Sequence, residues 1–171
     1  MEKIVERIYE KKQMMLNQIF QEFDEVYHSV ALKCGLSDSA FFILYSICEL
    51  GNGCLQRDIC SVTFTSKQTI HSSIRKLEQA GYLRLETGRG RDKHIFLTEA
   101  GERLIEQKIR PILIAESQVF GEMTKEEGDT LLRLSEKYLS ILRKNLDRSW
   151  EKLSGEEKRK AEISENEEEM D

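Results

Sequence analysis

Apolar residues recur at every third or fourth position over most of the chain, which predicts a largely helical protein. Residues 2–33 contain no glycine or proline and carry a single apolar stripe, so they predict a long amphipathic helix. A second helix is expected from near Ser37-Asp38 to Leu50, where Gly51-Asn52-Gly53 breaks the pattern.

A helix-turn-helix pair is expected next. The pattern predicts a short helix at about 55–60, a turn at 61–64 and a helix at 66–80. Thr65 and Gln68 have the spacing of a capping box, which would begin the second of these helices.

The apolar period then changes from about 3.6 residues to about two. Alternate apolar residues share one face in residues 82–86 and again in residues 94–97, as they do in β-strands. The loop between the two segments contains two glycines, so the pattern predicts a β-hairpin.

Helical spacing returns after the hairpin. One helix is expected from Glu99 to about Phe120, bent where Pro111 removes a backbone donor. Thr124 and Glu127 form another capping box, opening a helix that runs through Leu146. Because helix, turn, helix and hairpin follow one another, the expected fold class is mainly α with a small β-hairpin wing, a winged helix-turn-helix.

The helix at 66–80 has one apolar and one polar face. Ile70, Ile74 and Leu77 group within a narrow arc that must face the core. The opposite side carries amide, hydroxyl and basic side chains, and no acid occurs from Thr65 to Leu77. Amide and guanidinium groups pair with purine edges in a DNA major groove, and short hydroxyls reach phosphates. The alternative is a solvated helix face, although such faces usually mix both signs of charge.

The predicted hairpin is basic as well. From Ser61 to Leu97 the chain has seven bases and three acids. Gly88 and Gly90 allow the loop to approach a duplex closely, and an arginine at its tip suits a narrow minor groove. A basic loop alone is equally consistent with simple solvation. The candidate DNA-binding residues are Thr65, Ser66, Gln68, Thr69, Ser72, Arg75, Lys76, Arg89, Arg91 and Lys93.

The net charge comes from the end of the chain. The formal charge is -5, and residues 151–171, with nine acids and four bases, account for all of it. The sequence therefore predicts a domain at 1–148, which is neutral overall, and an acidic tail at 149–171. The Glu-rich end of the tail, from Ser164, is expected to be disordered.

Two stretches resemble the MarR family of bacterial transcription regulators. Residues 65–81, followed by Tyr82-Leu83, resemble its recognition helix. Residues 88–101 resemble its wing and the Leu-Thr-x-x-Gly start of its next helix. The resemblance covers about residues 5–148, with the helix-turn-helix at about 55–80 and the wing at 82–98. It implies a homodimer that binds a pseudo-palindromic operator in double-stranded DNA, acting as a repressor because an occupied operator blocks polymerase.

The predicted wing departs from that family at one position. The family's wing usually has Asp-x-Arg ahead of its second strand. Here the Arg falls on Arg91, which the resemblance gives the minor-groove role, but the Asp position holds Arg89. The acid that usually braces the wing is therefore absent from that position, and Asp92 is a candidate substitute.

The resemblance also implies dimerisation helices at 2–33 and 99–148. A larger monomeric core is the alternative explanation of their apolar stripes. Members of the family commonly respond to small aromatic ligands, metals or oxidants at the hinge between the dimer helices and the winged domain. Aromatics that could line such a site are Phe20, Phe23, Tyr27, Phe41, Phe42 and Tyr45, although aromatics at helical spacing are more often core residues.

Cys34 and Cys48 lie near the same region and are candidate redox thiols. In a reducing compartment, the alternative for all four cysteines is a role as small, partly buried hydrophobic side chains.

Other functional classes have little support. The sequence has no CxxC pair, Gly-rich phosphate loop, GxSxG or HExxH, so it predicts no enzyme, no cofactor and no metal site. No apolar run approaches the ~20 residues that span a bilayer, and the first residues lack a secretion signal, so a cytoplasmic protein is expected. The alternative function is a winged-helix protein-interaction module that no longer reads operator DNA, which the acidic tail favours and the basic face opposes.

Overall fold

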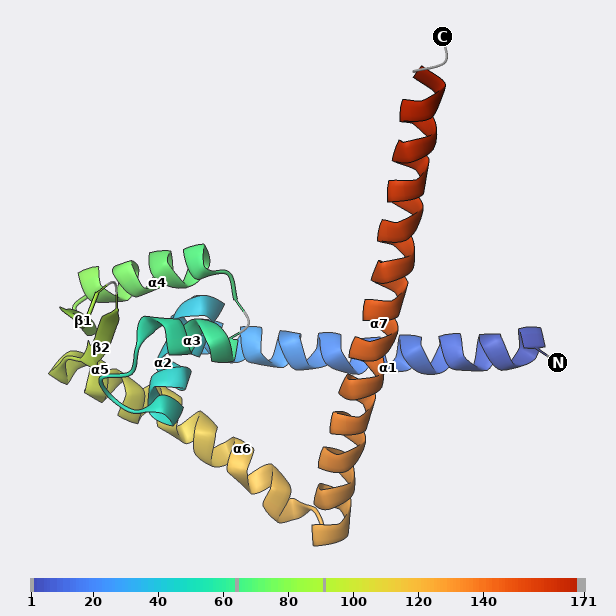
Figure 1. Cartoon of the computed structure of the whole chain (residues 1–171). Helices are drawn as coiled ribbons and strands as arrows, with labels where there is room; N and C mark the ends of the chain where they lie inside the picture. Colours follow the sequence, from blue (N-terminus) through green and yellow to red (C-terminus); the bar gives the residue numbers. More distant parts are fainter. Residues whose placement is uncertain (1, 64, 91, 169–171) are drawn as a thin grey trace. The chain divides into compact units, whose positions relative to one another are not determined.

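The structure is a computed structural model that describes residues 2–63, 65–90 and 92–168. It divides into two compact units, Met1–Ala115 and Glu116–Asp171. Helices make up most of both units, and the first also contains a two-stranded antiparallel hairpin (Figure 1). The predicted fold class, mainly α with a β-hairpin wing, is confirmed.

The first unit begins with two helices joined by a tight turn. α1 spans Glu2–Lys33 and α2 spans Asp38–Leu50, as predicted. Gly35 adopts φ 73° in the turn, a left-handed conformation that costs glycine little. The Ser37 side chain accepts a hydrogen bond from the backbone N–H of Ala40 at 3.4 Å and so caps α2.

The helix-turn-helix pair has different boundaries from those predicted. α3 spans Gln56–Thr63 and so continues through the first three residues of the predicted turn, where the Thr63 hydroxyl donates to the carbonyl of Ile59 at 2.9 Å. α4 spans Lys67–Gln79. Its cap is Ser66, which accepts from the N–H of Thr69 at 3.1 Å. The predicted capping box at Thr65 is wrong, because the Thr65 hydroxyl donates to the carbonyl of Thr63 instead.

The core of this unit fixes the orientation of α4. Ile70, Ile74 and Leu77 are buried, as their spacing predicts. The Ser73 hydroxyl, also buried, lies 2.7 Å from the Ser39 hydroxyl and links α4 to α2. The other large side chains that are fully buried are Phe41, Ile43, Leu44, Ile47, Ile59, Ile95 and Ile109. Each such side chain stabilises the fold by about 1.5–3 kcal/mol, so the opposite side of α4 is held outward.

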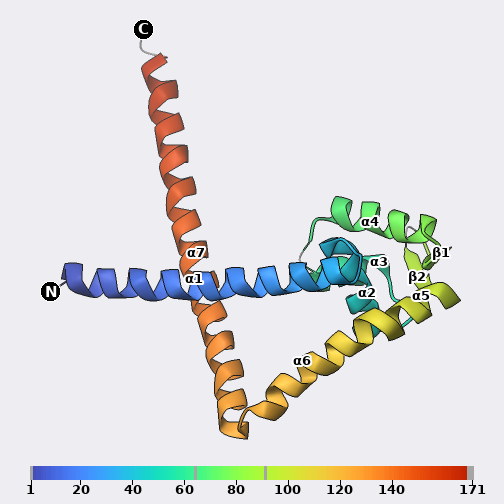
Figure 2. The ribbon, with the colours of Figure 1, turned by 180° about the vertical axis from the view of Figure 1, so that it is seen from behind.

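The wing is formed by β1 (Leu83–Thr87) and β2 (Lys93–Leu97), which pair antiparallel with Leu83 opposite Leu97. β1 begins one residue later than predicted because the N–H of Tyr82 donates to the carbonyl of Leu77 and closes the end of α4. β2 begins one residue earlier. In both views α4 lies along one edge of the unit and α5 (Glu99–Leu104) lies beyond the hairpin (Figure 1 and Figure 2).

The helix predicted to bend at Pro111 contains a wide turn just before the proline. α5 is followed by a π-helical turn, η1 (Ile105–Ile109), and then by α6 (Arg110–Glu122). The N–H of Arg110 donates to the carbonyl of Ile105, five residues back. The proline ring would clash with the carbonyl four residues before it in a regular α-helix, and the wider turn relieves that conflict.

The second unit consists of the end of α6 and α7, which spans Lys125–Glu168. The predicted capping box is confirmed, since Glu127 accepts from the N–H of Thr124 at 2.9 Å and the Thr124 hydroxyl accepts from the N–H of Glu127 at 3.3 Å. α7 continues through the acidic tail to Glu168, so the tail is helical from Ser164 to Glu168, where disorder was expected. Residues 169–171 lie outside the described part of the chain.

Two helices approach the composition of a membrane span without reaching it singly. Among the described residues, no single helix is both long and apolar enough to cross a membrane, and Tyr9–Lys33 with Asp38–Leu50 passes that test only as a pair bent by 90°.

Candidate nucleic-acid interface

The side of α4 opposite the core is exposed and polar. Gln68, Ser72, Arg75 and Lys76 are all exposed on this side. The first turn of the helix contains no acidic residue. Because an α-helix has a positive partial charge at its N-terminus, this end of α4 favours an anion.

Hydroxyl groups crowd the first turns of α4. The Ser66 and Thr69 hydroxyls lie 2.8 Å apart and share one proton between them, which leaves the other hydroxyl proton for an outside acceptor. The Ser72 hydroxyl donates to the carbonyl of Thr69 at 2.9 Å, and its oxygen can still accept a second bond. Thr65 is half-buried and bonded to Thr63, so it contributes less to this face than its neighbours.

A hollow of about 460 Å³ separates the end of α4 from the hairpin. Arg75 lines it from α4 and Lys93 lines it from β2, together with Glu78, Gln79, Leu85, Glu86 and Thr87. The fold therefore brings predicted residues from both elements to one side of the molecule.

Arg84, one of the bases of the wing, interacts with its own hairpin, although its side chain is half-exposed. Its guanidinium forms an ion pair with Glu86 and lies 4.4 Å from the centre of the Phe96 ring. The two interactions hold the guanidinium against its own hairpin.

The wing loop is tied to α3 by an ion pair that the sequence did not reveal. Arg57 Nη1 donates to both carboxylate oxygens of Asp92, at 3.0 Å and 3.1 Å. Beside the pair is a hollow of about 300 Å³, lined by Leu55, Gln56, Cys60, Lys67, His71 and Lys93 as well. Arg57 was not among the predicted residues, because nothing in its local sequence indicates a partner 35 positions away.

Arg89 and Lys93 are exposed on the wing. Arg89 precedes Gly90, which adopts φ 66° in the loop. Arg91, the residue to which the resemblance gives the minor-groove role, lies outside the described residues.

The two candidate redox cysteines lie in different surroundings. Cys34 is buried at the end of α1, where its thiol contacts the carbonyl of Lys108 at 3.7 Å and its own carbonyl accepts from Lys108 Nζ at 3.0 Å. Burial raises the pKa of the Cys48 thiol, although Arg110 partly opposes the effect. A raised pKa disfavours the thiolate that reacts with oxidants. Among the described residues, no group of three or more potential ligands is placed to hold a metal ion.

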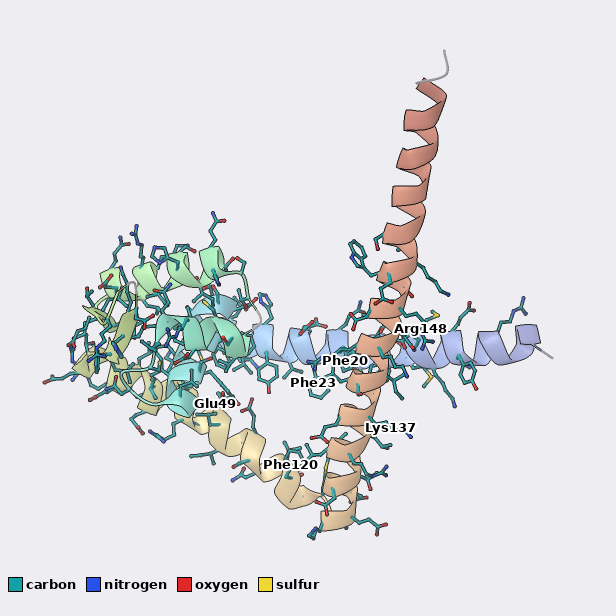
Figure 3. All side chains as sticks on the ribbon, viewed as in Figure 1. Phe20, Phe23, Glu49, Phe120, Lys137 and Arg148 are labelled. Carbon is teal, nitrogen blue, oxygen red and sulfur yellow. The ribbon has the colours of Figure 1, made fainter. Side chains whose placement is uncertain are left out.

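Four of the six candidate effector-site aromatics pack together. The ring centres of Tyr27 and Phe42 are 5.7 Å apart, and Phe41 lies 5.4 Å from Phe42 and 6.1 Å from Tyr45. Phe41 is fully buried, so this cluster belongs to the core of the unit. Phe20 and Phe23 are exposed on one side of α1 (Figure 3).

Comparison with known proteins agrees with this geometry. Residues 35–93 match the model of the MarR family. A MarR family regulator from Neisseria meningitidis has 17% identity and a TM-score of 0.70, with 81% of this chain and 98% of that chain covered. MepR of S. aureus in complex with DNA has 20% identity and a TM-score of 0.61, with 75% and 96% covered. No curated protein matches the sequence.

A third solved structure adds a ligand-regulated relative. BpsR of Bordetella bronchiseptica, whose DNA binding is regulated by 6-hydroxynicotinic acid, has 19% identity and a TM-score of 0.57, with 74% of this chain and 92% of that chain covered. The resemblance of this chain to the MarR family is thus confirmed by the match over residues 35–93 and by the shared fold.

Proposed function

We propose that this chain, with its MarR-type winged helix, is a DNA-binding transcription regulator. The observation that carries the proposal is the outer side of α4, which is exposed, lacks acids from Thr65 to Leu77 and shares a hollow with Lys93 of the wing. That combination suits a helix in a major groove with a hairpin beside it. MepR, which has the same fold, binds DNA.

The outward residues divide into two roles. Gln68 and Arg75 carry the planar amide and guanidinium groups that pair with base edges, so they read the sequence. The hydroxyls and cations around them contact phosphates and set the register without reading bases. These are Thr65, Ser66, Thr69, Ser72, Lys76 and Lys93, and Arg89 and Arg91 are the residues that we assign to the minor groove.

We infer that the regulator is a homodimer. On α7 the leucines at 132, 139, 146 and 153 recur every seven residues and are exposed, a spacing that places them along one side of a long helix. On α1, Met14, Phe23 and Val26 are exposed as well. A second copy would bury both faces, and its two-fold symmetry would match a pseudo-palindromic operator.

We propose that the dimer is a cytoplasmic repressor that a small aromatic effector releases from DNA. BpsR supports the ligand, because a small aromatic acid regulates its DNA binding. An oxidant signal at Cys48 has weaker support, since burial raises the pKa of that thiol.

Selection from a random DNA pool, followed by anisotropy with a labelled duplex, tests the proposal. Gln68→Ala and Arg75→Ala should each weaken binding and relax base preference at one position, by about 5- to 100-fold for a bidentate contact. Lys93→Ala should weaken binding to all duplexes alike. Arg103→Ala, an exposed cation on α5, removes the same charge on the far side of the hairpin and serves as the control.

Two results would end this proposal. The wild-type chain would enrich no sequence from the pool, or the variant combining Gln68→Ala and Arg75→Ala would bind the selected duplex as tightly as wild type. The acidic tail favours one other candidate, an interaction module without operator binding. Recovery of a stoichiometric protein partner with no enriched DNA would support that function instead.

A further inference from the structure

Among the described residues, one ion pair joins α3 to the wing loop, that of Arg57 with Asp92. One guanidinium nitrogen reaches both carboxylate oxygens, at 3.0 Å and 3.1 Å. The Asp92 side chain is 33% exposed and that of Arg57 is 65% exposed. The Asp92 side chain is therefore partly buried in the wing, while the more exposed Arg57 side chain extends to it from the surface of α3.

The backbone of Asp92 closes the same loop. Its carbonyl accepts from the N–H of Gly88 at 2.9 Å, and its N–H donates to the carbonyl of Arg89 at 3.3 Å. Asp92 is thus bonded across the loop through its main chain and to α3 through its side chain. A restraint on Asp92 therefore also restrains Arg89, whose carbonyl accepts from the N–H of Asp92.

We propose that Arg57 is a positioning residue for the wing, acting through Asp92, which rests on the proposed DNA-binding function. The pair takes the place of the acid that the resembled family has at the position of Arg89. In this pair the base, Arg57, is on α3 and the acid, Asp92, is on the wing. Arg89 remains free of any ion pair among the described residues and can face a duplex.

A direct role of Arg57 in binding phosphate is the competing explanation. Arg57 lines the same hollow as Lys67 and Lys93, so charge alone would place it in the DNA-binding surface. The two explanations predict opposite signs for one substitution. Asp92→Asn removes a negative charge beside the DNA-facing cations, so a purely electrostatic role predicts tighter binding. A positioning role predicts weaker binding, because the wing loses its tie to α3.

The affinity test compares four variants with the wild-type chain, using the duplex that the wild-type chain selects. Asp92→Asn and Arg57→Ala should each weaken binding about 2- to 5-fold, the range expected from losing an exposed ion pair. The exchange of both residues, Arg57→Asp with Asp92→Arg, should recover wild-type affinity and an unchanged dependence on salt. Asp58→Asn is the matched control, because Asp58 also contacts Arg57, at 3.8 Å, but does not belong to the wing.

Amide hydrogen exchange of Gly88 without DNA separates this inference from the proposed function. Its N–H bonds to the Asp92 carbonyl, so it should exchange faster in Asp92→Asn and Arg57→Ala and at the wild-type rate in the exchanged pair and in Asp58→Asn. Faster exchange in a chain that selects no duplex would support the tie to α3 while overturning DNA binding. Unchanged exchange, or tighter binding by Asp92→Asn, would overturn the positioning role.

Discussion

Substitution of Gly101 by alanine should destabilise the winged domain at one point of close backbone contact. A Cβ at this position would lie 2.1 Å from the carbonyl oxygen of Tyr82 and 3.2 Å from Cδ2 of Leu97. The oxygen has little freedom to move, since it accepts from the N–H of Thr98 at 3.0 Å. Thr98 in turn caps α5 and donates its hydroxyl proton to the carbonyl of Gly81. The helix and the start of the wing must therefore separate to admit the methyl group.

The size of the effect follows from that geometry. The contact is far inside the 3.0 Å below which Cβ atoms are essentially never found. Overpacking costs about 1–3 kcal/mol, and a clash with backbone rather than a side chain belongs at the upper end. Alanine returns up to about 1 kcal/mol through its helix propensity. We expect a net loss of about 2 kcal/mol, which lowers Tm by about 4–8 °C in a chain of this size.

Thermal unfolding followed by circular dichroism measures this loss. Gly121→Ala is the matched control, because Gly121 lies within α6 and a Cβ there meets nothing within 4 Å. That substitution should leave Tm unchanged or raise it. If Gly101→Ala and Gly121→Ala unfold at the same temperature, the close contact at Tyr82 does not constrain the fold and this reasoning is wrong.

Four further predictions address other parts of the molecule. The pKa of Cys48 is raised by burial. In a Cys34/Cys54/Cys60→Ser variant, the rate of alkylation of Cys48 should therefore rise with pH along a curve whose midpoint lies above that of an unstructured cysteine. A midpoint near neutral pH would contradict this prediction. The pKa of Glu127 is lowered by its bonds to Thr124, so its stabilisation of α7 should be present above about pH 4.5 and lost as the pH falls through the lowered pKa. Glu127→Ala should therefore unfold at a lower temperature than wild type at pH 7, and at the same temperature as wild type at low pH. Leu139→Glu with Leu146→Glu should convert a dimer to monomers in sedimentation, whereas Arg143→Glu, a change on the same helix, should not. If five cations of the candidate interface on each chain contact phosphates and each contributes about 0.9, the slope of log Kd against log salt concentration should reach at most about 9 for a dimer. Lys76→Ala removes one cation from each chain and should reduce this slope by about 2.

Periodicity predicted the helices because burial on one face leaves a regular mark along the sequence. Ile70, Ile74 and Leu77 fixed the orientation of α4, and the outward face followed from it. Helix ends were less certain, since several adjacent hydroxyls can cap a helix. Ser66 caps α4 rather than Thr65, and that choice depends on a bond from Thr65 back to Thr63.

Pairing between distant residues leaves no regular pattern in the sequence. The tie between Arg57 and Asp92 joins positions 35 apart. Asp92 was a candidate for bracing the wing, but nothing in its segment indicated Arg57 as its partner. A count of charges from Ser61 to Leu97 includes Asp92 as an uncompensated acid and leaves Arg57 outside. The π-helical turn before Pro111 was equally hidden, because a proline indicates strain in a helix without saying where the backbone relieves it.

Ion pairing changes the meaning of the charge count on the candidate interface. Arg84 is paired with Glu86 and Asp92 with Arg57, so these four charges cancel locally. Among the described residues of α4 and the wing, the unpaired charges that remain are Lys67, Arg75, Lys76, Arg89 and Lys93 against Glu78. A chain with a formal charge of -5 thus presents a surface that is almost wholly basic. Since exposed charges are screened beyond about 10 Å at 0.1 M salt, a duplex bound on this face would respond to those local cations rather than to the net charge of the chain.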